Sequence, residues 1–135
     1  MALHRPEDGH TMRTRVRFAL AAVGIVLLGL LSRMPALHLP PAWGDVLRAC
    51  MLYALLGLIA PQSRMVRRAM LAWGLCMLVE CSQLLHTPWL DALRATALGH
   101  LLLGSTFVAG DLLCYTLGVA CMYAVERWIR RRERR

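Results

Sequence analysis

Carboxylate, guanidinium and amide side chains recur within the apolar part of this sequence, at positions where they could meet in one polar cluster. Glu80 and Gln83 close one apolar stretch, and Asp111 opens the next with Tyr115 four residues behind it. Charged groups are expensive inside a bilayer, so in a membrane they need a partner or a function. Binding of a polar ligand and relay of protons are the chemistries that such residues could support.

The predicted polar cluster collects the acids and arginines of the apolar region together with one amide and one phenol. Its members are Arg33, Asp45, Arg48, Glu80, Gln83, Asp91, Arg94, Asp111 and Tyr115. Asp45 and Arg48 are three residues apart, so they share one side of a helix and can pair. Acids outnumber arginines by one, and a desolvated Glu80 is the candidate to hold a proton.

Two interpretations of the cluster stay open. In the first, its ion pairs only fix how the helices pack. In the second, it lines an outer-facing cavity that binds or moves a polar or lipid head-group ligand, or relays protons through Glu80 and Asp111. His38, His86 and His100 match no zinc-binding pattern, so neither a metal nor a cofactor is predicted. No catalytic residue is predicted either, because no nucleophile elbow, phosphate loop or HExxH motif occurs.

The elements that must position these residues are apolar helices. The chain has 135 residues, of which 58% are hydrophobic, more than in an ordinary soluble domain. Apolar stretches of helical length cover residues 18–31, 42–60, 69–86 and 107–127. Residues 88–103 form a shorter, amphipathic stretch that suits the membrane interface or a re-entrant position better than a full span. The predicted fold is therefore an all-α integral membrane protein with four transmembrane helices plus one short interfacial or re-entrant helix between the third and fourth.

The arginines predict how the chain sits in the membrane. All 16 basic residues are arginine, against 8 acids, which gives a net charge of +8. Four arginines lie at or before Arg17, three in residues 61–68 and six from Arg127 onward, thirteen in all. Four spans with both termini in the cytoplasm place all thirteen on the cytoplasmic side, as the positive-inside rule expects. We therefore predict a multi-pass membrane protein with both termini in the cytoplasm. Nucleic-acid binding is not predicted, because no recognition motif accompanies the charge.

The same charge pattern divides the chain. Residues 1–15 are predicted to be a mobile cytoplasmic arm, residues 16–128 the membrane domain, and residues 129–135 a cytoplasmic basic tail. Gly118 belongs to a series of small residues at every fourth position, which lets a neighbouring helix approach closely. Membrane lipids are the predicted partners, and a protein partner or a homo-oligomer belongs to the packing interpretation.

Several of these residues resemble a known family. Glu80-x-x-Gln83 at a helix end, then Arg94, then Asp111 with Gly118 behind it, resemble the VanZ-like membrane proteins, although Tyr115 stands where those proteins usually carry Asn. The match is closer to a related group of small bacterial polytopic membrane proteins that are catalogued as a domain of unknown function. The string similar to that group comprises Gly29 to Arg33, Gly44-Asp45, Tyr53, Glu80-x-x-Gln83, Leu90 to Thr96, Leu103-Gly104, Phe107 and Asp111 to Tyr115.

The resemblance covers about residues 18–120 and implies a bacterial inner-membrane protein. VanZ-like members are linked to glycopeptide resistance, which implies a role at the cell envelope. The leading hypothesis is an envelope-associated protein whose outer-side polar cluster binds or moves a polar or lipid head-group ligand. The alternative is a non-catalytic membrane assembly or interaction subunit whose ion pairs only fix helix packing.

Overall fold

The computed structural model describes residues 7–37, 39–103 and 109–135. In these residues the chain forms helices and turns and no strand, which confirms the all-α prediction for this part of the chain. The elements in order are α1 (Glu7–Leu31), the 3₁₀ helix η1 (Pro35–Leu37), α2 (Ala42–Ile59), α3 (Met65–Gln83), α4 (Pro88–Ala95), α5 (Ala97–Leu103) and α6 (Asp111–Glu133).

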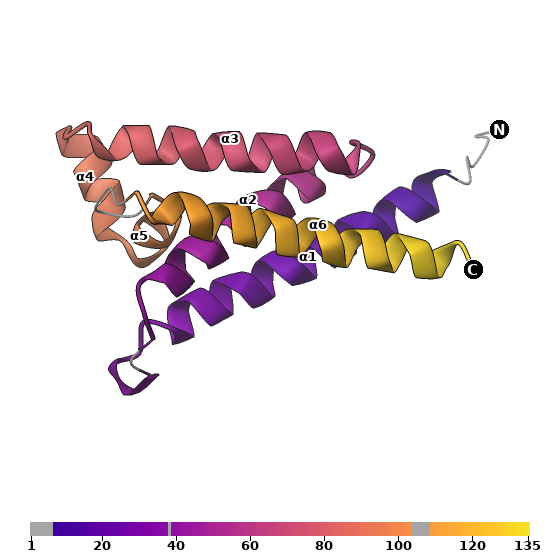
Figure 1. Cartoon of the computed structure of the whole chain (residues 1–135), viewed down its shortest axis with the longest axis horizontal. Coiled ribbons are helices and arrows are strands. Elements are labelled where there is room, and N and C mark those ends of the chain that lie inside the picture. The colour runs from indigo at the N-terminus through magenta and orange to yellow at the C-terminus, as the bar shows by residue number, and fades with distance from the viewer. Residues whose placement is uncertain (1–6, 38, 104–108) are drawn as a thin grey trace.

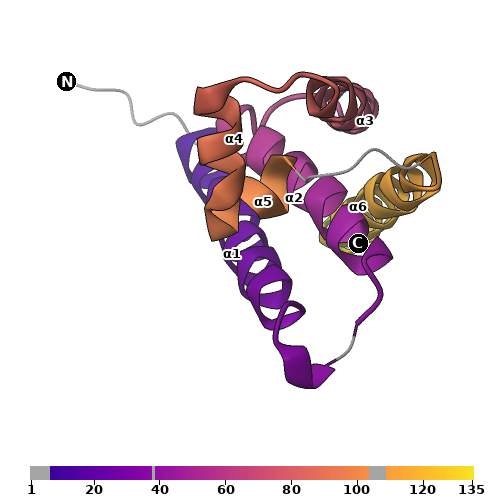
Figure 2. The same cartoon turned by 90° about the vertical axis from the view of Figure 1, so that its left-hand side faces the viewer.

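Helix α2 is the centre of the bundle. It packs against α1, α3 and α6, and α3 also packs against α6 (Figures 1 and 2). Residues Ala49, Tyr53 and Ala54 of α2 have no exposed surface, and they meet Ala72 of α3 and Tyr115 of α6 in the same buried cluster. Small side chains at most of these positions bring the helix axes close together.

A glycine sets the distance between α2 and α6. A Cβ atom built on Gly118 would lie 2.6 Å from the backbone oxygen of Val46 and 2.8 Å from the Cβ of Ala49. Both separations are shorter than van der Waals contact, so only glycine allows the two helices to approach this closely. The predicted role of Gly118 as a close-packing residue is confirmed.

The two ends of the bundle differ in composition. The start of α1 and the end of α6 lie at the same end as the connection between α2 and α3 (Figure 1). A hydrogen bond of 3.2 Å from Gln62 Nε2 to Thr11 Oγ1 joins that connection to α1. This end, which we call the arginine-rich end, holds the arginines of residues 7–17, 61–68 and 126–135. Helices α4 and α5 lie at the opposite end, which we call the α4–α5 end.

Several helices are long and apolar enough to cross a membrane. Helices α1, α2 and α6 qualify individually, and α3 qualifies together with α4, from which it is bent by 116°. Large apolar side chains such as Leu20, Leu28 and Leu113 are exposed on the outside of the bundle. These features indicate a multi-pass membrane protein with three spans, or four if α3 and α4 count as one bent span.

The segment expected as one amphipathic helix over residues 88–103 is two helices. The backbone of Thr96 is extended, with ψ of 152°, and separates α4 from α5. The Thr96 hydroxyl accepts a hydrogen bond of 3.0 Å from the Gly99 amide, so this residue starts α5 as an N-cap. In this segment Leu90 is buried, whereas Leu93 and Ala97 are exposed.

Two helix boundaries extend beyond the predicted membrane domain. Helix α1 begins at Glu7, inside residues 1–15, and α6 continues to Glu133, inside residues 129–135. Both extensions carry many arginines, which are good helix formers and do not interrupt a helix. The predicted start of the last span at Phe107 lies outside the described residues, and α6 begins at Asp111.

Candidate functional site

Arg48 is the centre of a buried network that joins α2, α3 and α6. Its guanidinium lies 3.2 Å from Asp45 on the same helix and 3.3 Å from Glu80 on α3. Arg48 also donates a hydrogen bond to the hydroxyl of Tyr115 on α6, and that hydroxyl donates to Glu80 Oε1. The side chains of Arg48 and Glu80 are 7% and 4% exposed, so the network is closed to solvent. The predicted pairing of Asp45 with Arg48 is present.

Gln83 extends this network toward α5. Its amide nitrogen donates to Glu80 Oε1 at 3.3 Å and to the backbone oxygen of Leu103 at 2.8 Å. The second oxygen of Glu80 and the amide oxygen of Gln83 are buried and have no hydrogen-bond partner among the described residues. A buried acceptor without a donor is costly, so these two oxygens are the places where the network can still take a proton donor.

Asp111 joins the network from the first turn of α6. Its carboxyl group is within hydrogen-bonding reach of the carboxyl group of Asp45. Glu80 Oε1, in contrast, accepts hydrogen bonds from three side chains. Asp111 therefore lies beside Asp45 at one side of the network, and Glu80 lies at its centre among the donors.

Arg94 forms a second group, apart from the Arg48 network. Its guanidinium donates to the backbone oxygens of Ser82 at 2.6 Å and Leu85 at 3.1 Å, at the end of α3, and pairs with Asp91 at 3.1 Å. Arginine at the last carbonyl groups of a helix satisfies acceptors that have no partner within the helix. His86 lies 3.7 Å from the same Asp91 carboxylate. Arg94 thus ties α4 to the end of α3.

A shallow groove of about 460 Å³ opens beside Arg94 at the α4–α5 end. We call it the Arg94 groove, and it is lined by Arg33, His86, Asp91, Arg94, Ala95, Thr96, Ala97 and His100. Burial and the nearby charge of Arg48 lower the pKa of Arg33. Burial and the charges of Arg33 and Arg48 also lower the pKa of His100. The groove is therefore a place where positive groups repel one another.

The predicted cluster is thus brought to one end of the bundle but divided in two. The Arg48 network contains Asp45, Arg48, Glu80, Gln83, Asp111 and Tyr115, and the Arg94 groove contains Arg33, Asp91 and Arg94. The Arg94 groove opens at the surface, whereas the side chains of Arg48, Glu80, Gln83 and Tyr115 are buried. Among the described residues no group of three or more His, Cys, Asp and Glu side chains could hold a metal ion; His38 lies outside them.

A comparison with known protein families identifies the family of this chain. A family model described as "Protein of unknown function (DUF2809)" matches residues 37–119, which is more than half of the chain. The chain belongs to the DUF2809 family. No solved structure matches the chain significantly. The DUF2809 match includes both the Arg48 network and Arg94, whereas Arg33 lies just before it.

A second buried network, at the arginine-rich end, was not predicted from the sequence. Arg68 has no exposed surface, and its guanidinium lies 2.6 Å from Glu126 of α6, which also accepts a hydrogen bond of 2.5 Å from Tyr53 of α2. Arg68 also donates to the backbone oxygens of Ala60 and Pro61. The network thus joins two DUF2809 helices to α6 beyond residue 119, where the match ends.

The sequence does not reveal this network, because Arg68 and Glu126 each lie in an arginine-rich stretch that is typical of a solvent-exposed segment. Arg68 follows Arg64 and Arg67 in the segment that the arginine pattern predicts to be cytoplasmic, and Glu126 directly precedes the basic tail. A signal was available: Tyr53 lies in an apolar stretch, and the hydroxyl of a buried tyrosine needs a hydrogen-bond partner.

Proposed function

We propose that this DUF2809 chain is a four-span protein of the bacterial inner membrane that binds a polar or lipid head-group ligand in the Arg94 groove. In this proposal both termini are cytoplasmic, the groove faces the outer side, and the ligand carries a phosphate or another anionic group. A role at the cell envelope and kinship with VanZ-like proteins belong to the same proposal.

The observation that carries the proposal is the excess positive charge of the groove, whose lining holds Arg33 and Arg94 against the one carboxylate of Asp91, which pairs with Arg94. Asp45 and Glu80, the nearest buried carboxylates, are engaged by Arg48. Among the described residues no ion pair joins Arg33 to a carboxylate, and the nearby charge of Arg48 disfavours the charged form of Arg33. An anion placed among these groups would relieve that repulsion, and a planar guanidinium binds phosphate well.

The proposal is tested by native mass spectrometry of the protein extracted together with its membrane lipids. We expect the wild type to retain a phosphate-bearing adduct and Arg33→Gln to bind it about fivefold more weakly, as expected for one arginine near an anionic head group. Arg64→Gln is the matched control, because Arg64 is equally an exposed arginine but lies at the other end of the bundle. Equal adduct retention by Arg33→Gln and wild type would contradict the proposal.

His100 supplies an independent readout. In the free protein its pKa is below the ordinary value near 6.5, because burial and two arginines disfavour the imidazolium. A bound anion favours the imidazolium, so the pKa of His100 should rise when the ligand binds. Ligand binding should therefore tighten as the pH falls toward the pKa of His100 in the complex. Histidine NMR in detergent micelles, with and without the extracted adduct, measures the shift. A His100 pKa that does not respond to the adduct would place the ligand elsewhere.

A second candidate function follows from the closed Arg48 network. Its ion pairs join three helices and are sealed from solvent, as expected for an assembly or interaction subunit whose ion pairs fix helix packing. Under this alternative Arg33→Gln leaves lipid retention unchanged, while Glu80→Gln changes stability or the retention of a protein partner. The same extraction experiment therefore separates the two functions.

A further inference from the structure

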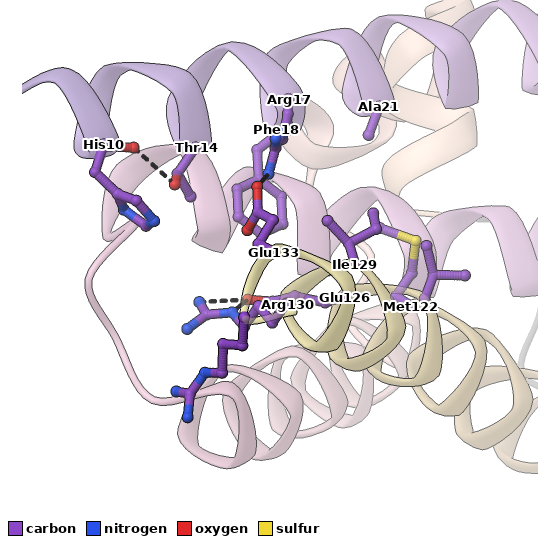
Figure 3. Close-up of a pocket in the computed structure, with 12 residues that line it drawn as sticks. His10, Thr14, Arg17, Phe18, Ala21, Met122, Glu126, Ile129, Arg130 and Glu133 are labelled. Carbon is purple, nitrogen blue, oxygen red and sulfur yellow. Dashed lines mark hydrogen bonds and ion pairs between the residues drawn. The ribbon is translucent and has the colours of Figure 1, made fainter.

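A second groove lies at the opposite end of the molecule, between α1 and α6 (Figure 3). Its volume is about 290 Å³. Both helices pack closely on α2, whereas they make few contacts with each other. We call it the α1–α6 groove. It shares no lining residue with the Arg94 groove, so it is a separate site.

The walls of the α1–α6 groove change from polar to apolar along both helices. On α1 the lining residues His10 and Thr14 near the chain end are followed by Phe18 and Ala21 deeper in the bundle. They are three or four residues apart, so they form one stripe on the helix. On α6 the order along the chain is reversed, and apolar Met122 precedes the polar residues near the C-terminus. Because the start of α1 and the end of α6 lie at the same end, both walls are polar at the mouth and apolar inside.

Three arginines stand at the mouth: Arg17, Arg130 and Arg134. Two carboxylates lie among them. Glu126 is already held by Arg68 and Tyr53 inside the bundle, so its bond with Arg130 at 2.6 Å is an additional one.

Glu133 forms an ion pair with Arg17 across the mouth of the groove, and these side chains are 39% and 50% exposed. An ion pair that exposed contributes little, so a phosphate can replace the Glu133 carboxylate at Arg17 at small cost.

We propose that the α1–α6 groove binds an anionic glycerophospholipid of the leaflet at the arginine-rich end. The phosphate contacts Arg130, Arg134 and Arg17, and one acyl chain follows the apolar wall past Ala21 and Met122. The volume is at the small end of ligand pockets, so the groove holds the head group and the start of one chain while the rest stays in the bilayer. The basic mouth beside an apolar interior is the complement of such a lipid and of no soluble anion.

The proposal is tested by titrating the full chain, purified in neutral detergent, with phosphatidylglycerol and with phosphatidylcholine of the same acyl chains, and counting bound lipids by native mass spectrometry. We expect phosphatidylglycerol to bind in preference. The double variant Arg130→Gln, Arg134→Gln should bind it roughly 30-fold more weakly, about fivefold for each arginine. The control Arg131→Gln, Arg135→Gln removes the same charge from positions that do not line the groove and should bind as the wild type does.

A second variant, Val125→Trp, keeps every charge and fills the apolar part of the groove, so it should also weaken binding of phosphatidylglycerol. Val125 lines the groove and its side chain is exposed, so the substitution is compatible with folding. Equal loss in the control double variant would show attraction to the basic tail alone and overturn the proposal. Equal binding of phosphatidylcholine would show annular lipid, and displacement by millimolar inorganic phosphate a site for free anions. Dimers that form in place of lipid adducts would show that a second copy occupies the groove. Each of these results overturns the proposal.

Discussion

At the scale of single residues, each buried charge in the described part of the chain has an oppositely charged partner. Arg68 has two carboxylate oxygens of Glu126 and several backbone oxygens around it, and the ring of Phe18 lies 4.7 Å from its guanidinium carbon. Transfer of such a pair from water costs nearly as much as its attraction returns, so the intact pair adds little net stability. Removal of one partner is different, because the other charge is then buried without compensation.

This reasoning predicts that Glu126→Ala lowers the free energy of unfolding by about 3–5 kcal/mol, since Arg68 would remain buried and unpaired. Glu133→Ala is the matched control: it removes a glutamate of the same helix whose partner Arg17 is half exposed, and it should cost about 0–1 kcal/mol. Denaturant unfolding in detergent, followed by circular dichroism, measures both. Similar losses in the two variants would contradict the importance of burial. The double variant Arg68→Met, Glu126→Leu should recover most of the loss, because neither charge remains.

The two buried networks also show what residue patterns can predict. Asp45 and Arg48 stand alone in an apolar helix, so their pairing follows from spacing and cost. Arg68 and Glu126 stand beside other charges, and nothing in their immediate sequence separates a buried arginine from a solvated one. Only the packing of α2, α3 and α6 around Tyr53 makes that distinction.

At the scale of elements, the apolar runs predict the helices well where proline or charge marks their ends. Helix α2 begins and ends within one residue of the predicted range because Pro41 and Pro61 bound it. The break between α4 and α5 has no such mark. It depends on the Thr96 cap and on Gly99, where a Cβ atom would lie 1.8 Å from the backbone oxygen of Leu93. A glycine in an apolar segment is compatible with a continuous helix, so this turn could not be read from the pattern.

The contact of α2 with α6 gives a prediction at the same scale. Gly118→Ala should destabilise the protein by about 1–3 kcal/mol, because the added methyl group overlaps the backbone of Val46 and the helices must move apart. Gly74→Ala, in the middle of α3 where a Cβ atom meets nothing within 4 Å, should be neutral or stabilising by up to about 1 kcal/mol. Denaturant unfolding of both variants in the same detergent checks the pair. A Gly118→Ala variant as stable as the wild type would mean that α2 and α6 can separate freely.

At the scale of the whole molecule, most of the arginines lie at one end of the helix bundle. The arginine-rich segments near both termini meet the connection between α2 and α3, and the Arg94 groove opens at the α4–α5 end. A soluble bundle has no reason for this sorting, whereas a membrane protein has one, because arginine-rich loops resist translocation. The Arg94 groove and the α1–α6 groove lie at opposite ends of the bundle, so in the proposed topology they belong to opposite leaflets.

This arrangement predicts that the turn at Gln62 is cytoplasmic and the turn at His86 is on the outer side. Alkaline phosphatase inserted at His86 should be active, since the enzyme needs disulfides that form only outside the cytoplasm, and the same insertion at Gln62 should be inactive. Both turns are exposed and lie between helices, so the insertions are matched. Replacing Arg64 and Arg67 with glutamine should raise activity at Gln62, because the loop then loses two of the charges that hold it inside. Activity at Gln62 and none at His86 in the unmodified chain would reverse the orientation and place both grooves in the other leaflets.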